Sequence, residues 1–383
     1  MLNLPRFLLA TKRTGQKNSK KVDPFAGFVP RETFDFDPTL KWFPHHMAKA
    51  TVAIPKRLPM VDVVVEVRDA RLPITSAQFE LDSMIRLGPG KHRVVVLNKQ
   101  DLVPRNACRQ AVSLLEMDGT PVFTTSAVNN SNVSGITAFI TEHVRTKFKS
   151  LGVTVMVVGL PNTGKSTILN AMKAVSPHPS YGKAGAKMSA IPGSTTNIGK
   201  IQINDHHPKI FVLDTPGVMI RKCAILEEVE SAEIMMKLAT IGAIPDTVSG
   251  ISSLCDYILF QLNKNGLFDY CKVLGLPAPS NDVDAVILAS AKSINPGTAR
   301  IDHHGGAMAF IKKFRDGQLG KLCIDTIPSD IDAIIEKRDL ERNFQFISEP
   351  PGPWGPEAYP VNTMVDRAIY APVGERRRRE FPG

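Results

Sequence analysis

The sequence predicts an α/β domain, with a mostly parallel sheet covered by helices on both faces, followed by a smaller helical domain. Short β-branched runs alternate with segments of helical length between residues 60 and 220. These runs are apolar at nearly every position, as in strands that are buried on both faces. After about residue 221 such runs disappear, and only segments of helical length follow. With 383 residues, of which 43% are hydrophobic, the chain is long enough for two domains and their extensions.

Each element of this fold follows from its local pattern. Apolar runs of strand length predict strands at 61–67, 93–97, 121–125, 153–159, 198–203 and 208–213. Segments with helical spacing between them predict helices at 77–87, 104–117, 134–149 and 165–174. The helical domain is expected to contain helices at 224–243, 248–262, 282–290 and 305–315. We therefore divide the chain into an N-terminal extension, an α/β domain, a helical domain and a C-terminal tail, at 1–40, 41–220, 221–330 and 331–383.

Positive charge is concentrated at the N-terminus. The net charge is +10, and residues 1–60 hold eleven Lys or Arg against four Asp or Glu. The first 22 residues contain six basic and no acidic side chains, together with an apolar face, which is typical of a mitochondrial import sequence. Attraction to a polyanion explains the same charge, so both interpretations are open here. Four consecutive arginines at 376–379 lie in a Pro/Gly-rich tail that we expect to be an extended arm.

Composition also excludes several classes of protein. No apolar run approaches the roughly 18 residues of a membrane-spanning helix, so we expect no transmembrane segment. The five cysteines are far apart and include no CxxC pair. This spacing argues against a disulfide framework or a zinc site and favours a reducing compartment.

Residues 159–166 match the pattern GxxxxGK[ST] and directly follow a predicted strand. Such a loop turns backbone N–H groups toward phosphates, and the following helix N-terminus adds a positive dipole end. Lys165 is expected to neutralise the β- and γ-phosphate oxygens, and the Ser166 hydroxyl to ligate Mg²⁺. The candidate phosphate-binding residues of this loop are Asn162, Thr163, Gly164, Lys165, Ser166 and Thr167.

Residues 98–101 fit the pattern NKxD at the end of another predicted strand. The Asp101 carboxylate can accept hydrogen bonds from guanine N1–H and N2–H₂, which adenine does not offer, so Asp101 is the expected specificity residue. Asn98 is expected to brace the loop, and the stem of Lys99 to cover the base. The dipeptide Ser126-Ala127 offers a weaker signal for a backbone contact to guanine O6.

Residues 214–217 fit DxxG and close the strand predicted at 208–213. Asp214 can hold Mg²⁺ through a water molecule, and the Gly217 N–H can reach the γ-phosphate, so hydrolysis would release this loop. A threonine for Mg²⁺ is available nearby. We favour Thr195, with Thr196 as the alternative.

The order of these motifs is unusual, because NKxD at 98 precedes the phosphate loop at 159, the threonine at 195 and DxxG at 214. A parallel sheet tolerates such a circular permutation when the former chain ends lie close together. The new break then falls at about residue 218, so the DxxG loop runs directly into the helical domain. We expect the nucleotide state to be transmitted to residues 221–340.

The permuted motifs, with the sequences at 42–50, 67–73, 237–239 and 314–320, resemble the circularly permuted ribosome-assembly GTPases of the ribosome biogenesis GTPase A branch. The resemblance covers about 280 residues. It implies a P-loop GTPase that binds GTP or GDP with Mg²⁺ and acts in late maturation of a large ribosomal subunit. It further implies slow hydrolysis that the ribosome activates, and contacts to rRNA and other assembly factors. If the N-terminus is an import sequence, the protein acts in the mitochondrial matrix, and its partners are the large-subunit precursor of the mitochondrial ribosome and the rRNA of that subunit. We expect a monomer.

The resemblance also suggests catalytic groups. Val218 stands where signalling GTPases place a water-orienting glutamine. Asn162 matches an asparagine that ligates K⁺ in related GTPases, and His46 matches a histidine proposed to act on the attacking water. His45 replaces the family's glycine before it, so a capping or packing role for His46 is equally open. The candidate catalytic residues are His46, Asn162, Lys165, Thr195 and Gly217, and the candidate metal ligands are Ser166, Thr195 and Asp214.

Two alternative functions are compatible with the same motifs. In one, the protein is an RNA-binding scaffold that nucleotide merely stabilises, and hydrolysis is incidental. In the other, it is a regulatory GTPase that its basic N-terminus recruits to anionic lipid as a peripheral membrane contact.

Overall fold

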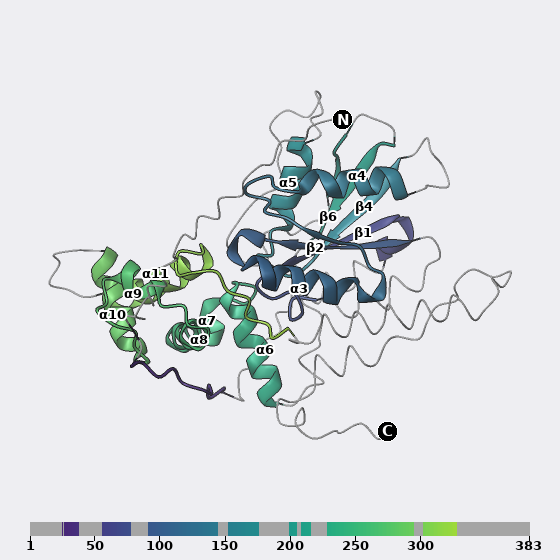
Figure 1. The fold of residues 1–383 in the computed structure, drawn as a ribbon. Coiled ribbons are helices and arrows are strands. Elements are labelled where there is room, and N and C mark those ends of the chain that lie inside the picture. Colours follow the sequence, from purple (N-terminus) through teal and green to yellow (C-terminus); the bar gives the residue numbers. More distant parts are fainter. Residues whose placement is uncertain are drawn as a thin grey trace, which may run out of the picture.

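The computed structural model describes Phe25 and residues 27–37, 56–77, 91–144, 152–175, 199–204, 208–215, 228–294 and 302–327. An α/β domain comes first along the chain and a helical domain follows it. The two lie beside each other, with α6 between the sheet and the other helices (Figure 1). Both domains are therefore present in the order that the sequence predicted.

Within the described residues, six strands form one sheet with the spatial order β3-β2-β1-β4-β6-β5. The strands are β1 Val63–Asp69, β2 His92–Asn98, β3 Val122–Thr124, β4 Val153–Val158, β5 Gly199–Gln202 and β6 Ile210–Asp214. The pairs β1·β2, β1·β4, β2·β3 and β4·β6 are parallel, whereas β5 is antiparallel to β6. The sheet is thus mostly parallel, with one antiparallel edge strand. This is the predicted fold class.

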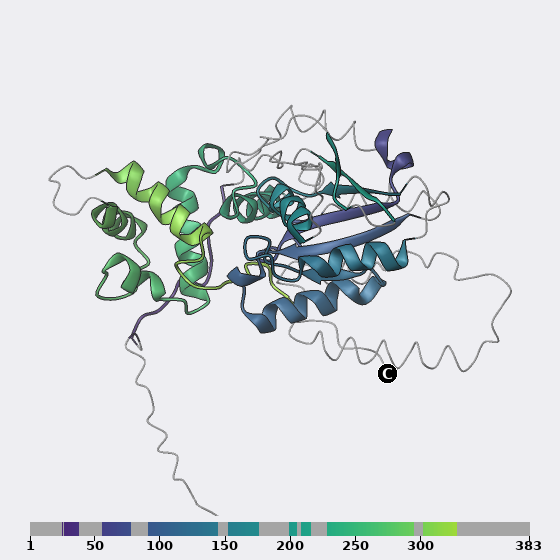
Figure 2. The same ribbon diagram turned by 90° about the horizontal axis from the view of Figure 1, so that it is seen from above.

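Helices cover both faces of the sheet (Figure 2). The helices α4 Val133–His143 and α5 Lys165–Val175 bury Ile136, Ile140 and Ile168 against the valines of β1, β2, β4 and β6. The helix α3 Arg105–Leu115 packs Ala111 on the opposite face. Short 3-10 helices complete this domain at η1 Leu58–Met60, η2 Gln100–Leu102 and η3 Glu116–Asp118.

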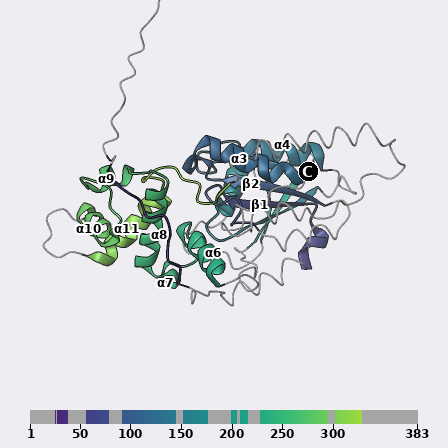
Figure 3. The same ribbon diagram turned by 60° about the horizontal axis from the view of Figure 1, so that its bottom comes forward.

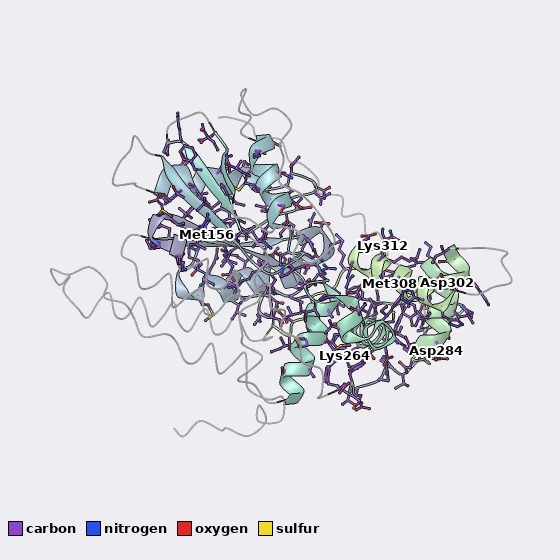
Figure 4. All side chains as sticks on the ribbon, turned by 180° about the vertical axis from the view of Figure 1, so that it is seen from behind. Met156, Lys264, Asp284, Asp302, Met308 and Lys312 are labelled. Atoms are coloured by element: carbon purple, nitrogen blue, oxygen red, sulfur yellow. The ribbon has the colours of Figure 1, made fainter. Side chains whose placement is uncertain are left out.

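The helical domain has its own apolar core. Its helices are α6 Glu228–Thr240, α7 Asp246–Ser249, α8 Ile251–Lys264, α9 Asp269–Leu274, α10 Val283–Ile294 and α11 His303–Arg315. Tyr270 and Phe310 are among its fully buried side chains. Gly250, with φ +74°, separates α7 from α8, and the Asp302 carboxylate caps α11 by accepting a 2.9 Å hydrogen bond from the Gly305 N–H. In Figure 4, Met156 marks the sheet, and Lys264, Asp284, Asp302, Met308 and Lys312 mark this domain.

The two domains share buried contacts. Leu72 and Leu160, from loops of the α/β domain, belong to the same apolar cluster as Phe310. Beyond α11, the chain returns to the α/β domain, where the Leu322 N–H donates to the Leu102 carbonyl at 3.1 Å. The Asp325 carboxylate accepts hydrogen bonds from the Ile74 and Thr75 N–H groups, each at 2.8 Å. The helical domain is therefore anchored beside the loop that follows β1 and beside η2.

Residues 27–37, which we name the N-terminal arm, run across the helical domain between α9 and α7 (Figure 3). Arg31 makes a two-pronged ion pair with Asp256 of α8, with Nη1–Oδ2 and Nη2–Oδ1 distances of 3.1 and 2.5 Å. The Phe34 ring lies 5.1 Å from the Tyr257 ring and 5.5 Å from the Phe260 ring, centroid to centroid. Part of the segment that we expected as a basic extension is thus packed on the second domain.

Some expected elements differ from those observed. The single helix expected at 248–262 is two helices, because Gly250 interrupts it, and the six-residue α9 was not expected. The helix expected at 77–87 falls almost wholly outside the described residues, as does the end of the helix expected at 134–149. Among the helices that the structure describes, none is both long and apolar enough to cross a lipid bilayer.

Candidate nucleotide-binding site

The nucleotide motifs lie at one edge of the sheet, where its parallel strands end. β4 leads into the phosphate loop, β2 ends at Asn98, β3 precedes Ser126, and β6 ends at Asp214. β1, which lies between β2 and β4, ends at Asp69. Because the carboxyl ends of neighbouring parallel strands meet at the same edge, motifs that are far apart in sequence come together here.

The phosphate loop has a backbone that only certain residues can adopt. Gly159 has φ +150°, and a Cβ at this position would lie 2.3 Å from the Val67 carbonyl oxygen. Gly164 has φ +95°, and its Cβ would lie 2.2 Å from Asn98 Nδ2. Neither position accepts a side chain. These glycines therefore let the loop turn tightly between β4 and α5, as a loop that wraps phosphate requires.

Lys165 begins α5, and its side chain folds back into the loop. Its ammonium donates a 2.8 Å hydrogen bond to the Leu160 carbonyl oxygen, and the residue is only 7% exposed. The Thr163 hydroxyl donates to the same carbonyl at 2.9 Å. The charge is thus held within the loop, in a position suited to a phosphate group.

The Asn98 side chain joins two loops of the site. Its Nδ2 donates a 2.9 Å hydrogen bond to the Thr163 carbonyl, and its Oδ1 accepts a 3.1 Å bond from the Ala127 N–H. Asn98 is 2% exposed. It therefore fixes the NKxD loop to the phosphate loop on one side and to the Ser126-Ala127 loop on the other.

Lys99 connects the NKxD loop to the phosphate loop a second time. Its Nζ donates a 2.6 Å hydrogen bond to the Asn162 carbonyl and lies 2.9 Å from Asp69 Oδ2. Arg71 holds the other side of Asp69, with an Nε–Oδ1 distance of 2.9 Å and an Nη2–Oδ2 distance of 2.8 Å. Burial alone would raise the pKa of Asp69, but Arg71 and Lys99 outweigh it and hold the pKa well below its usual range.

The remaining base-recognition candidates differ in accessibility. Asp101 is exposed in η2, where a ligand can reach it. The Ser126 hydroxyl accepts a 2.9 Å hydrogen bond from Asn129 Nδ2. The Ala127 N–H, one of the backbone groups that the Ser126-Ala127 dipeptide offers to guanine O6, donates to Asn98 Oδ1 in this structure. Whether these groups read a base stays a prediction.

Of the remaining candidate residues, which include the expected metal ligands Ser166, Thr195 and Asp214, only some fall within the described residues. Ser166 and Thr167 lie half-buried in the first turn of α5. Asp214 ends β6, and the Thr215 hydroxyl after it donates a 2.6 Å hydrogen bond to the Val157 carbonyl, which fixes the start of the DxxG loop on β4. His46, Thr195 and Gly217 lie outside the described residues.

Asn162 contacts the helical domain. Its φ of 60° is in the left-handed region, and its Nδ2 donates a 2.6 Å hydrogen bond to the carbonyl of Gly242, in the turn after α6. Arg315 of α11 fixes the same turn, since its guanidinium donates to the Ala239 and Thr240 carbonyls at 2.7 and 3.0 Å. The phosphate loop and the helical domain are thus joined directly.

Comparisons with known proteins identify the family of this chain. Residues 154–274 match a family model described as 50S ribosome-binding GTPase. Mitochondrial ribosome-associated GTPase 1 of Mus musculus is 32% identical over 305 residues, which is 74% of this chain and 90% of the relative. The Xenopus tropicalis protein of the same name is 31% identical over 317 residues, or 77% of this chain and 98% of the relative. The chain belongs to the mitochondrial ribosome-associated GTPase 1 family.

A solved structure also resembles the chain. The crystal structure of GNP-bound YlqF from T. maritima covers 72% of this chain and 97% of its own, with a TM-score of 0.46 and 21% identity.

As a member of this GTPase family, the protein binds guanine nucleotide and hydrolyses GTP. Its sheet explains how the permuted order still forms one site. β2 leads into NKxD and β4 leads into the phosphate loop, and only β1 separates these two strands in the sheet. The two motifs are therefore close in space although NKxD comes first in sequence. Spatial neighbourhood, not chain order, brings the motifs together.

Sequence reasoning missed three residues that organise this GTPase site. Asp69 and Arg71 entered only as part of the segment 67–73 that carries the family resemblance, and Gly242 did not enter at all. The charged residues at the end of a strand that begins with three valines were the available signal for Asp69 and Arg71, because buried charges need partners. Gly242 contributes a backbone carbonyl, for which no side-chain pattern exists.

Proposed function

We propose that this GTPase acts in maturation of the large subunit of the mitochondrial ribosome, and that its nucleotide state controls its association with large-subunit rRNA. The observation that carries the coupling is the 2.6 Å hydrogen bond between Asn162 and Gly242, which joins the phosphate loop to the helical domain. The names of the relatives support a ribosomal partner and a mitochondrial location. A change at the phosphates can then reach an RNA-binding surface through packed structure.

The chain's own residues suffice to describe much of the hydrolysis reaction. Lys165 neutralises charge that develops on the phosphate oxygens, and the N-terminus of α5 adds its dipole. Bound Mg²⁺ would supply further charge stabilisation, with Ser166 and Thr195 as direct ligands and Asp214 through water. Since Val218 cannot orient water, hydrolysis is slow alone, and the ribosome completes the site. His46 is the candidate for acting on the attacking water.

A potassium ion is the second proposed cofactor. Asn162 would ligate it through Oδ1, because Nδ2 donates to Gly242. The amide offers one acceptor and one donor atom, so the two contacts are chemically compatible. Potassium at this position would supply positive charge beside the transferred phosphate.

The charge distribution supports an RNA partner. Residues 1–60 and the arginines at 376–379 carry the concentrated positive charge that binding to a polyanion requires. We propose that the protein works as a monomer, contacts other assembly factors on the large-subunit precursor, and reaches the matrix through its N-terminal sequence.

Sedimentation of the tagged protein from fractionated mitochondria tests this function. We expect the protein to co-migrate with large-subunit precursors. A non-hydrolysable GTP analogue should increase the co-migrating fraction. Lys165→Ala should abolish that response and arrest subunit maturation, whereas Lys173→Ala, on the last turn of the same helix, should leave it intact. Normal ribosome profiles with Lys165→Ala would instead indicate a scaffold. Flotation with anionic liposomes in the absence of ribosomes would indicate a membrane-recruited GTPase.

A further inference from the structure

We infer that Asp69 is a positioning residue for guanine nucleotide, whose carboxylate holds the base-reading loop against the phosphate loop. The sheet gives Asp69 the place for this role. β1 lies between β2 and β4, and Asp69 is the register partner of Asn98, the first residue of NKxD. The carboxylate therefore lies between the two loops that grip opposite ends of a nucleotide.

Lys99 is the residue on which this carboxylate acts. The Lys99 backbone has φ +62°, a left-handed conformation that is uncommon for lysine and costs roughly 1 kcal/mol. Its ammonium lies 2.9 Å from Asp69 Oδ2 and donates to the Asn162 carbonyl at 2.6 Å. Burial disfavours the charged lysine, so its pKa is lowered although Asp69 opposes this. Without the carboxylate, the partly buried ammonium would lose its ion-pair partner and would move toward solvent.

Arg71 fixes the direction of the carboxylate. Its guanidinium contacts both oxygens of Asp69, and the Arg71 N–H donates to Oδ1 at 3.1 Å. Arg71 Nη1 also lies 3.4 Å from the Arg315 carbonyl of α11, and its guanidinium lies 5.9 Å from the centre of the Phe314 ring. The carboxylate is thus held in one plane, so that Oδ2 faces Lys99. A geometry fixed from two sides positions a loop better than a single contact does.

The consequence for ligand binding follows from the place of Lys99. Its stem is assigned to cover the base, and Asp101, two residues later in η2, is assigned to read it. This inference rests on those assignments of the proposed site. Displacement of Lys99 would loosen both contacts. Asp69 is fully buried, and its carboxylate oxygens pair with Arg71 and Lys99, so it acts through Lys99.

Glu66 provides a matched control on the same strand. It is also fully buried and ion-paired with two cations, with distances of 2.9 Å to Arg68 Nε and 2.5 Å to Arg93 Nη2. It contacts no nucleotide motif through these pairs. In the full chain, Asp69→Asn and Glu66→Gln each remove one buried charge and should both lower the thermal midpoint. Asp69→Asn alone should weaken GDP binding, by about tenfold or more.

Discrimination between guanine and hypoxanthine is a quantity that a loss of stability alone would not change. Inosine diphosphate lacks the guanine N2 amine, so the ratio of its dissociation constant to that of GDP reports on Asp101. Asp69→Asn should narrow this ratio, and Glu66→Gln should preserve it. Equal effects of the two substitutions on GDP affinity and on this ratio would overturn the inference.

Two further comparisons complete the test. In a Lys99→Met background, Asp69→Asn should change GDP affinity less than about twofold, since the partner is already gone. If Asp69→Asn weakened GDP binding as much in the Lys99→Met background as in the wild type, the inference would be overturned. If Asp69→Asn does not fold, Asp69→Glu and Glu66→Asp shift each carboxylate by one methylene, and only Asp69→Glu should weaken GDP binding. Failure of the wild-type protein to bind GDP would refute the site itself.

Discussion

The amide of Asn162, in the phosphate loop, donates a 2.6 Å hydrogen bond to the carbonyl oxygen of Gly242, in the turn that follows α6. The two residues are 80 positions apart and belong to different domains. Arg315 holds the Gly242 turn by donating to the Ala239 and Thr240 carbonyls. An ion pair with Asp246, at 2.5 Å, fixes its guanidinium in turn. A movement of the phosphate loop at Asn162 would therefore be passed to the Gly242 turn of the helical domain through this hydrogen bond.

Replacing Asn162 by glycine should loosen this junction. Glycine accepts the backbone φ of 60°, so the substitution removes the amide without adding backbone strain. Loss of one hydrogen bond of about 1 kcal/mol should speed amide hydrogen exchange at residues 241–244 about fivefold. Asn130→Gly is the control, since Asn130 also has a positive φ of 50° but is exposed in a separate loop. Equal exchange in the two variants would show that the contact does not restrain the turn.

Asp101→Asn should change the preferred base. The amide presents a donor where the carboxylate accepted hydrogen bonds, so guanine loses two partners and the carbonyl of xanthine gains one. We expect GDP affinity to fall about a hundredfold and xanthosine diphosphate to become the better ligand, as measured by competition. Retention of the preference for GDP would contradict the assignment of Asp101 as the base reader.

Glu66 should make part of the stability depend on pH. Burial by itself raises its pKa, but Arg68 and Arg93 outweigh burial and lower the pKa from its ordinary value of 4.5 to about 2. Because the folded pKa is the lower one, the stabilisation is present at neutral pH and is lost as the pH falls from 4.5 toward 2. By linkage, the wild-type free energy of unfolding should lose about 2 kcal/mol through this group by about pH 3.

Urea denaturation of Glu66→Gln tests this dependence. The variant should be less stable than the wild type at neutral pH, and the difference should shrink between about pH 5 and pH 3. A constant difference over that interval would mean that Glu66 does not titrate with a lowered pKa.

The N-terminal arm should contribute measurably to stability. Phe34 packs against the aromatic rings of Tyr257 and Phe260, so Phe34→Ala should lower the free energy of unfolding by about 2 kcal/mol. Val29→Ala, in the same arm but at a position that is 78% exposed, should change it by less than about 0.5 kcal/mol. Chemical denaturation measures both. Equal effects would show that the arm does not dock through Phe34.

Much of the sheet could be predicted because it depends on local pattern. The run ending at Val158 has a β-branched or apolar side chain at nearly every position, and a glycine follows it, so β4 was located to within one residue. Apolar runs do not indicate strand direction, and the antiparallel pairing of β5 was therefore not visible. Gly250 divides a segment with continuous helical spacing, and the spacing alone did not show the break.

The connections between motifs could not be predicted in the same way. The pair Asp69–Lys99 exists because β1 lies between β2 and β4, and this spatial order is not written in the chain order. Gly242 acts through a carbonyl that every residue carries. The aromatic residues of the arm lie in a segment that we expected only as part of a basic extension, so the surface that they cover was not anticipated.

The arm also has a consequence for how the protein is made. Arg31 and Asp256 are separated by 225 residues, so their contact can close only after α8 has formed. During synthesis, Phe34 and Phe36 are therefore made well before Tyr257 of α8, which they contact in the folded protein. Until α8 forms, the apolar surface of these two aromatic side chains is exposed and can associate with other unfolded chains.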